Sequence, residues 1–290
     1  MSVFKTAIVL VALAGFAFVA FLFWPRFPTV AVDADFRVTD RAVIARGGYI
    51  TAAAGCVSCH WDKEGGGTPF AGGRRIASPF GDFISPNITP DQATGIGAWT
   101  PSDFLRLMQH GYLPSGQPTF PSFPWGHYRH ISQNDALAIY AYLMSLAPVS
   151  QVQRGNELPF PLSARPAQLV WRWLFMPASV DVTDRGAYLV HALGHCGACH
   201  TPRNALGGRQ SDRLLEGVTD QSGKVLVPGL TASTGLGNWS ADELDDFLTD
   251  GFKPNYDTVE GEMALVIEHG TSRLTAADRA ALVAYLKSLP

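Results

Sequence analysis

The chain lacks the features that mark nucleic-acid binders and most enzymes that act alone. Its 22 Lys and Arg against 25 Asp and Glu leave a formal net charge of −3 over 290 residues, whereas a nucleic-acid binder carries a basic patch or a high isoelectric point. The sequence contains no phosphate-binding loop, no nicotinamide fingerprint and no recognisable nucleophile–base pair. We therefore expect no nucleic-acid partner, and we expect any substrate chemistry to belong to another protein.

Charged residues are scarce, at 16%, whereas hydrophobic residues make up 47% of the chain, including one long apolar run near the N-terminus. Thr6 to Trp24 is a stretch of 19 residues without a charge, which as a helix spans roughly 28 Å, close to the thickness of a bilayer core. A cleaved signal peptide has a shorter apolar region followed closely by a small-residue site. The best such site, Val32-Asp33-Ala34, lies well past the run. We therefore expect residues 1–37 to be a retained anchor and linker, and either interpretation exports the remainder.

Cysteine is also rare, and its few positions are informative. The chain has only four cysteines, which lie in a first motif, Cys56-Val-Ser-Cys59-His60, and a second motif, Cys196-Gly-Ala-Cys199-His200. The CxxCH pattern is typical of c-type haem attachment. Two thiols three residues apart lie on one face of a helical turn, so both can form thioethers to one porphyrin. The pattern predicts two covalently bound haem c groups, with each histidine presented to an iron.

Two other kinds of site use CxxC pairs. A tetrahedral zinc site would take all four cysteines, but it would join pairs 140 residues apart and leave both histidines unexplained. A thioredoxin-like dithiol is expected near a βαβ pattern, and the sequence shows none. Haem attachment is the interpretation that accounts for every residue of both motifs.

The two motifs belong to an internal repeat. Arg46-Gly-Gly-Tyr49 precedes the first and Arg185-Gly-Ala-Tyr188 precedes the second, and a tryptophan (Trp99 or Trp239) follows the second cysteine of each by 40 residues. Each unit closes with a helical pattern opened by Ser-x-x-Asp or Thr-x-x-Asp, which resembles a helix-start box. Few runs alternate apolar and polar residues. The repeat predicts two similar all-α domains, at 38–150 and 179–290.

The segment between the repeats, 151–178, is rich in proline, and such a density excludes one long helix. Inside it, residues 168–176 (QLVWRWLFM) are strongly apolar. We interpret this segment as a strap that packs the two domains together. A binding surface or a membrane-interface contact made by Trp171 and Trp173 is the alternative.

At this point the sequence resembles a known family. Each unit resembles a class I cytochrome c, and residues 40–290 resemble the membrane-bound dihaem cytochromes c that accompany bacterial periplasmic dehydrogenases, including alcohol and aldehyde dehydrogenases. The resemblance rests on GCVSCH, AGGRRI, SPFGDFISPNITPDQATGIGAW and PSFPWGHY in the first unit, and on HCGACHTPRN and GEMALVIEHG in the second.

The resemblance implies an all-α fold and a set of iron ligands. His60 and His200 would be the proximal ligands, and Met263, in a loop before the last helix, would be the distal ligand of the second haem. Pro202 would orient the proximal histidine of the second unit through a backbone carbonyl, whereas the first unit departs from the pattern after His60. Outer contacts of this type tune the iron's potential.

The distal ligand of the first haem is left open. Where the family's more familiar version has Pro-Ala-Met-Pro, this chain has Pro-Ser-Phe123-Pro124, and a phenylalanine cannot bind iron. The nearby Met108 is expected to be a core residue. The alternatives are His127 or His130, an open or weakly ligated iron, or a residue from elsewhere, such as Met176 or Tyr128.

Several other residues have two interpretations. Arg74, Arg75 and Arg203 would pair with haem propionates or be solvated. Trp99 and Trp239 would donate to a propionate or wall a haem pocket. His191 and His195, four residues apart before the second motif, would lie on a solvated face or beside the haem.

The sequence predicts a membrane-anchored dihaem electron carrier on the periplasmic side of the inner membrane. It would take electrons from a periplasmic dehydrogenase and pass them to quinone, another cytochrome or a terminal oxidase, so that the haems perform the redox step. One alternative is a haem enzyme with an open first iron, peroxidase-like or oxidising sulfur compounds. Another is an electron-transfer subunit built into a larger respiratory or photosynthetic complex.

Overall fold

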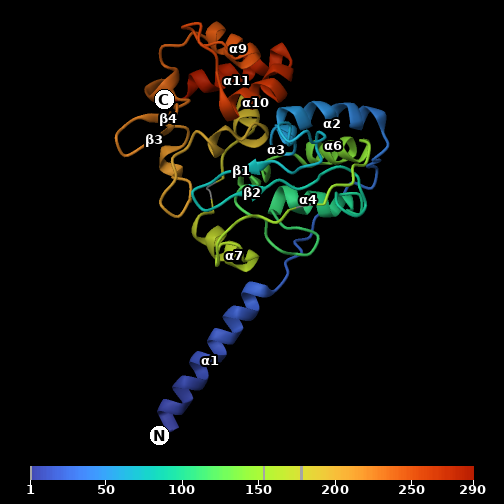
Figure 1. The fold of residues 1–290 in the computed structure, drawn as a ribbon, viewed down its shortest axis with the longest axis vertical. Coiled ribbons are helices and arrows are strands. Elements are labelled where there is room, and N and C mark those ends of the chain that lie inside the picture. The colour runs from blue at the N-terminus through green and yellow to red at the C-terminus, as the bar shows by residue number, and fades with distance from the viewer. Residues whose placement is uncertain (1, 153, 177–178) are drawn as a thin grey trace.

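The computed structural model describes residues 2–152, 154–176 and 179–290. Helices joined by long loops make up most of the fold, and a long N-terminal helix extends away from the rest (Figure 1). The helices are α1 (Ser2–Phe23), α2 (Arg41–Ala53), α3 (Cys56–Cys59), α4 (Pro101–His110), α5 (Trp125–Tyr128), α6 (Gln133–Met144), α7 (Arg165–Leu174), α8 (Arg185–Ala187), α9 (Ala241–Asp250), α10 (Gly261–His269) and α11 (Ala276–Ser288).

Helices are the main regular secondary structure, as the all-α prediction requires, but the described residues also form two small antiparallel sheets. One pairs β1 (Arg75–Ile76) with β2 (Phe83–Ile84), and the other pairs β3 (Val218–Thr219) with β4 (Val225–Val227). Their strands are only two or three residues long, too short to show an alternating sequence pattern.

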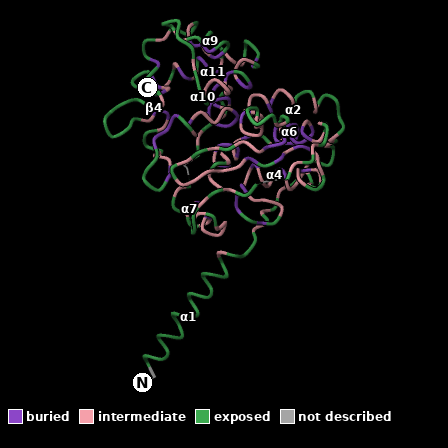
Figure 2. Tube along the Cα trace, in the orientation of Figure 1, coloured by how far each residue is buried: buried purple, intermediate pink, exposed green. Residues whose placement is uncertain are grey.

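Helix α1 contains the apolar run. Its residues Val3–Phe23 are long and apolar enough to cross a membrane, and none of that span is buried against the protein (Figure 2). A signal sequence near the N-terminus meets the same criterion.

In each repeat, an early helix crosses the closing helix at a glycine. A Cβ atom on Gly47 of α2 would lie 1.9 Å from the Ala138 carbonyl oxygen on α6, and one on Gly186 of α8 would lie 2.2 Å from the Ala281 oxygen on α11. Only glycine permits such a close approach. Helix α8 continues through a π-helical stretch, Tyr188–Leu193, toward the second motif.

Only the serine half of the predicted helix-start box of α6 forms, and its acidic residue has other partners. Ser132 accepts a hydrogen bond from the Asp135 N–H, as predicted. The buried Asp135 carboxylate then accepts from Arg46 Nε at 2.7 Å and from the Tyr188 hydroxyl at 2.8 Å. The same hydroxyl accepts the Ser132 N–H at 3.1 Å. A tyrosine from the second repeat therefore caps the backbone that an N3 glutamate would otherwise cap.

The start of α11 repeats this arrangement in reverse. Thr275 accepts from the Asp278 N–H, and the Asp278 carboxylate accepts from Arg185 at 2.8 Å and from the Tyr49 hydroxyl at 2.5 Å. The Tyr49 hydroxyl also accepts the Thr275 N–H at 3.3 Å. In each repeat, the arginine and the aspartate of the same repeat thus form a pair, and the tyrosine binds the aspartate of the other repeat.

One continuous core runs through both repeats. Leu105 and Leu143 from the first repeat belong to the same cluster of buried residues as Leu193 and Leu286 from the second. The apolar area that stabilises each repeat is therefore partly supplied by the other.

The segment between the repeats contains α7, which contacts both of them. Arg172 donates to the Gly111 carbonyl of the first repeat at 2.9 Å, and Trp171 Nε1 donates to the Leu206 carbonyl of the second at 2.8 Å. Residues 177–178, at the end of the predicted strap, lie outside the described residues.

Replacing the two crossing tyrosines tests this reciprocal arrangement. We expect Tyr49→Phe and Tyr188→Phe each to reduce the free energy of unfolding by about 1.5 kcal/mol, because a charged acceptor loses its donor. The double variant should lose roughly the sum. Thermal unfolding followed by circular dichroism measures the change.

Tyr142→Phe is the matched control, because Tyr142 lies on α6 and its hydroxyl has no hydrogen bond to any residue that the structure describes. Its melting temperature should stay within error of the parent. If the crossing variants melt like this control, the tyrosines do not tie the repeats together.

Candidate haem sites

Both CxxCH motifs fold into the same local shape. Each starts after a residue in the left-handed region, Gly55 (φ 62°) in the first and His195 (φ 41°) in the second, and then makes a single helical turn. The His60 N–H donates to the Cys56 carbonyl at 3.0 Å, and the same bond recurs in the second motif at 2.9 Å. A left-handed histidine costs about 1 kcal/mol or more relative to glycine. The turn brings two thiols and one imidazole to each site.

Both histidines predicted as proximal ligands are oriented by a proline carbonyl. His60 Nδ1 lies 2.7 Å from the Pro86 oxygen, and His200 Nδ1 lies 2.7 Å from the Pro228 oxygen. Because a carbonyl can only accept, each Nδ1 must carry the proton, which leaves the Nε2 lone pair for a metal. Burial lowers the pKa of both imidazoles, so both stay neutral at pH 7. This donor set fits two haem irons.

The expected role of Pro202 is wrong. Its carbonyl accepts from the Gln210 N–H at 2.9 Å, while Pro228, farther along the chain, orients His200. The first repeat uses Pro86 in the same way, so its departure after His60 does not cost it the orienting bond. The signal was present in the repeat, since each proline opens a matching string (PNIT and PGLT).

The cysteines are not arranged as a zinc site. Within the described ranges, which include all four cysteines, no group of three or more His, Cys, Asp or Glu side chains is placed to hold a metal ion. Burial raises the pKa of Cys56 and of Cys196 to about 12, which keeps both thiols protonated.

The arginines expected near the haems bind protein groups in this structure. Arg74 donates to the Ser58 carbonyl of the first motif, and Arg203 donates to the equivalent Ala198 carbonyl of the second at 2.8 Å. The carbonyl that precedes the second cysteine thus accepts from an arginine in both motifs, although the two arginines lie at different distances along the sequence from their motifs. The third, Arg75, pairs with Asp82 and Glu157 on the surface.

Met263 lies on a helix and not in the expected loop. It is the third residue of α10, which begins at Gly261 with a φ of 64° and continues through a run of good helix formers. The glycine therefore starts the helix instead of extending the loop. Met263 itself is partly buried against the common core.

Helix α10 belongs to the second repeat but lies against the first motif. Ser58 Oγ donates to the Leu265 carbonyl at 3.2 Å, and Arg74 pairs with Glu262 at 2.6 Å. The rings of His269 and Trp61 lie 5.6 Å apart. One helix therefore joins the predicted distal ligand of one haem to the attachment site of the other.

Backbone hydrogen bonds fix the register between the two distal segments. The Thr119 N–H donates to the Gly111 carbonyl, and the Val259 N–H donates to the Gly251 carbonyl. Both the donor and the acceptor of the second bond are 140 residues after those of the first. Continuing this offset aligns Phe123 with Met263. The described structure thus agrees with the register in which phenylalanine replaces the methionine of the first repeat.

His127 is buried beside the second motif. Its Nδ1 lies 2.8 Å from the His191 carbonyl and its Nε2 contacts the Arg209 guanidinium. Its ring is so close to Gly197 that a Cβ there would lie 3.2 Å from its Cε1 atom. Burial and Arg209 lower the pKa of His127 to about 2. Within the described residues, both ring nitrogens thus have protein partners.

The solvated alternative for His191 and His195 is wrong. His191 is buried, with Nε2 at 2.7 Å from the Tyr285 hydroxyl, and burial lowers its pKa to about 4. The His195 ring lies 5.4 Å from that of Tyr128, whose hydroxyl donates to the Ala54 carbonyl just before the first motif. These rings fill the space between the two motifs.

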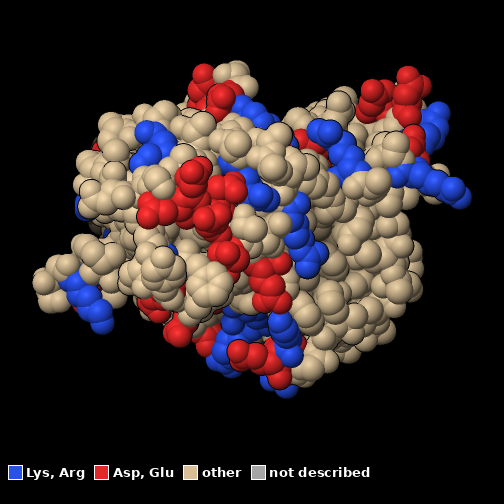
Figure 3. Space-filling model, turned by 90° about the horizontal axis from the view of Figure 1, so that it is seen from above, with Lys and Arg blue, Asp and Glu red and all other residues tan. Residues whose placement is uncertain are grey.

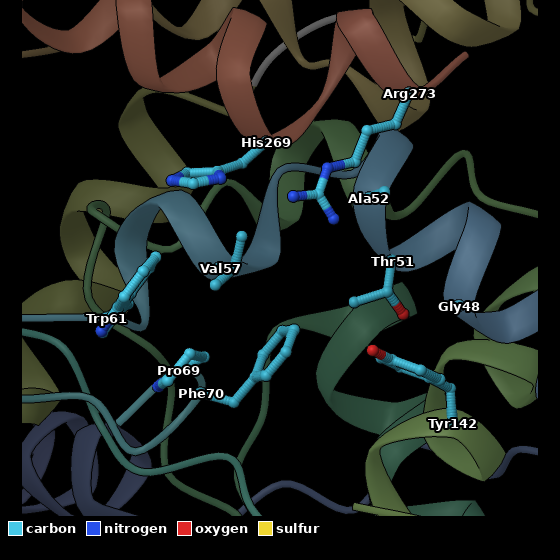
Figure 4. A pocket seen from close by; sticks show the side chains of 10 residues that line it. All are labelled: Gly48, Thr51, Ala52, Val57, Trp61, Pro69, Phe70, Tyr142, His269 and Arg273. Carbon is cyan, nitrogen blue, oxygen red and sulfur yellow. The ribbon is translucent and has the colours of Figure 1, made fainter. Parts of the chain in front are cut away.

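A cavity of about 290 Å³ adjoins the first motif (Figure 4). Val57 of the motif lines it, together with aromatic side chains and with His269 and Arg273 from the second repeat. Two of its buried polar atoms, Thr51 Oγ1 and His269 Nε2, have no hydrogen-bond partner. The sequence did not point to His269 or Arg273, because they reach this place only through the packing of α10 on α3.

The chain matches no family model, but it is similar to curated cytochromes. It is 38% identical to the "Diheme cytochrome c-type" protein of Cereibacter sphaeroides, over 85% of this chain and 86% of that protein. It is 40% identical to the gluconate 2-dehydrogenase cytochrome c subunit of Pantoea cypripedii, over 89% of this chain and 62% of that subunit. It is 36% identical to the fructose dehydrogenase cytochrome subunit of Gluconobacter japonicus, over 86% and 53%. The chain thus spans little more than half the length of these dehydrogenase subunits.

Removing the cysteines of one motif at a time tests the attachment sites. We expect Cys56→Ala/Cys59→Ala and Cys196→Ala/Cys199→Ala each to halve the covalently bound haem per chain, since thioether-linked haem survives denaturing electrophoresis. Haem staining of the gel, normalised to protein, measures this ratio. Full staining of either variant would exclude its motif as an attachment site.

Replacing Met263 tests the second distal ligand. We expect Met263→Leu to convert one haem from low spin to high spin, because the iron loses a strong axial ligand, as measured by low-temperature EPR of the oxidised protein. Met108→Leu is the control, since Met108 is buried in the core on α4, and its spectrum should match the parent. An unchanged Met263→Leu spectrum would exclude methionine ligation by this residue.

Proposed function

The chain belongs to the dihaem c-type cytochromes, and from this we propose that it carries electrons from a periplasmic dehydrogenase toward the respiratory chain. The supporting relatives include cytochrome subunits of gluconate and fructose dehydrogenases. Its acceptor would be a quinone, a second cytochrome or a terminal oxidase. The oxidation of the organic substrate would take place on the dehydrogenase.

The observation that carries the proposal is the matched pair of oriented histidines. His60 and His200 each present Nε2 while a proline carbonyl holds Nδ1 at 2.7 Å. When bound, a haem c supplies a one-electron iron couple. The chain's own residues would attach the porphyrin and aim the imidazole, which are functions expected of an electron carrier.

We assign the two haems to the two repeats, with domains at 38–150 and 179–290 and the segment 151–178 as a strap. Cys56 and Cys59 would attach one haem and Cys196 and Cys199 the other. Met263 would be the distal ligand in the second domain. In the first domain, the protein contacts of His127 favour an open iron, His130 or another residue.

We place α1 in the inner membrane as a single anchor, with the haem domains in the periplasm. The exposed apolar surface along the whole of Val3–Phe23 supports this placement, because such a surface is costly in water. Periplasmic haem domains would meet a periplasmic dehydrogenase.

A haem enzyme is the second candidate, and one observation favours it. The cavity beside the first motif has two buried polar atoms for which the described residues provide no hydrogen bond, and the aligned distal residue is Phe123. An open first iron there would accept a small ligand such as peroxide or a sulfur compound. Binding of cyanide or carbon monoxide to one haem of the unaltered protein distinguishes this candidate from a carrier whose irons are both six-coordinate.

Membranes from a strain that lacks this chain provide the functional test. We expect gluconate, fructose or ethanol to reduce haem c in membranes complemented with the parent chain, as seen in the haem α-band. In membranes carrying Cys196→Ala/Cys199→Ala, substrate-dependent reduction of an added quinone or of oxygen should be lost.

Assay of the dehydrogenase with an artificial dye serves as the control, because it bypasses the cytochrome and should be unaffected by the variant. If the parent and the variant support equal substrate-dependent oxygen uptake, the chain does not carry these electrons.

A further inference from the structure

Helix α7 shows its apolar side to solvent and its polar side to the protein. Val170, Trp173 and Leu174 lie three and four residues apart, on one face, and all are exposed, Trp173 to 80% and Leu174 to 55%. On the other face, Gln168 and Arg172 are buried. This is the reverse of a helix that covers a protein core.

The buried arginine fixes this orientation. Arg172 donates to the carbonyls of His110 and Gly111, and its guanidinium lies 3.9 Å above the Trp125 ring. It also lies 4.6 Å from the centre of the Tyr112 ring. Rotating α7 to hide its apolar face would expose these carbonyls and break the cation–π contacts. The apolar face must therefore find its partner outside the chain.

The end of the apolar helix α1 lies next to α7. The Arg26 N–H donates to the Gly116 carbonyl at 2.8 Å, and Arg165 of α7 donates to the nearby Pro118 carbonyl at 3.0 Å. Pro166 of α7 and residues 22–26 line one small hollow together with this loop. Figure 1 shows α7 on the side of the globular part from which α1 leaves.

The surface near this junction is suited to the edge of a bilayer. Trp24, just after α1, is 71% exposed, and Phe27 is also exposed. Tryptophan favours the headgroup level of a membrane. On the opposite side of the globular part, Figure 3 shows many acidic and basic side chains. The exposed apolar residues of α7 and of this junction thus lie on the side from which α1 leaves.

We propose that α7 lies at the lipid–water interface, with Val170, Trp173, Leu174 and Met176 against the bilayer surface. Interfacial helices bind in this way through an apolar face with aromatic residues. The inference rests on the proposed anchoring by α1, since α1 brings this face to the membrane. The chain would then be attached at two points and held in one orientation, instead of hanging from a flexible tether.

Nitroxide labels in proteoliposomes test the contact on the full-length holoprotein. Trp173→Cys carries the label, since the native cysteines are occupied by haem. Val11→Cys in α1 is the lipid reference, and Tyr256→Cys, on an exposed loop of the second repeat, is the aqueous reference. Collision rates with oxygen, which concentrates in lipid, and with a soluble nickel complex are measured by EPR. We expect the oxygen-to-nickel ratio at 173 to exceed that at 256 several-fold.

Each other outcome has a definite meaning. An aqueous ratio at 173 with a lipid ratio at 11 overturns the contact and leaves the anchor intact. Aqueous ratios at both sites overturn the anchor as well. A label at 173 that becomes shielded from both reagents only when the dehydrogenase is added would show that α7 is a protein-docking surface, which also overturns the proposal. Leu174→Cys replaces Trp173→Cys if the latter fails to assemble.

Discussion

The exchange of tyrosines between the two repeats is the constraint on which the rest of the architecture depends. Tyr49 and Tyr188 each cap the closing helix of the other repeat and donate to its aspartate. Neither repeat can complete its helix start alone, and neither can bury its core alone. The position of the strap, the packing of α10 on the first motif and the closeness of the two CxxCH turns all follow once the repeats are joined in this way.

The sequence predicted the parts whose signals are local. A few neighbouring residues are enough to recognise a CxxCH motif, a closing helix or its capping residue. The structure contains the repeat and its helices. The sequence also suggested Phe123 as the replacement for methionine, and the shared 140-residue offset supports that register. The prediction of local structure failed at Gly261, because a glycine can either extend a loop or begin a helix. Gly261 begins a helix.

Other features were not predictable because they depend on residues far apart in the chain. Pro86 and Pro228 open matching strings in the two repeats, but their contact with the histidines depends on the path of the intervening loops, which no periodicity encodes. The repeated Arg-Gly-x-Tyr strings were visible in the sequence, but the partner of each tyrosine lies in the other repeat. Burial of His191 likewise arises from packing against His127 of the first repeat and Tyr285 of the closing helix, so its position in the sequence did not exclude a solvated face.

Helix α10 gives this chain a form of internal linkage. It carries Met263, the predicted ligand of the second iron, and it holds the first motif through Ser58 and Arg74. If oxidation of one haem changes the conformation or strain of α10, it changes the reduction free energy of the other haem. Oxidation of the second haem then changes the reduction free energy of the first by the same amount, because such coupling is reciprocal. The two midpoint potentials would then be properties of the pair, and a substitution beside either haem would shift both.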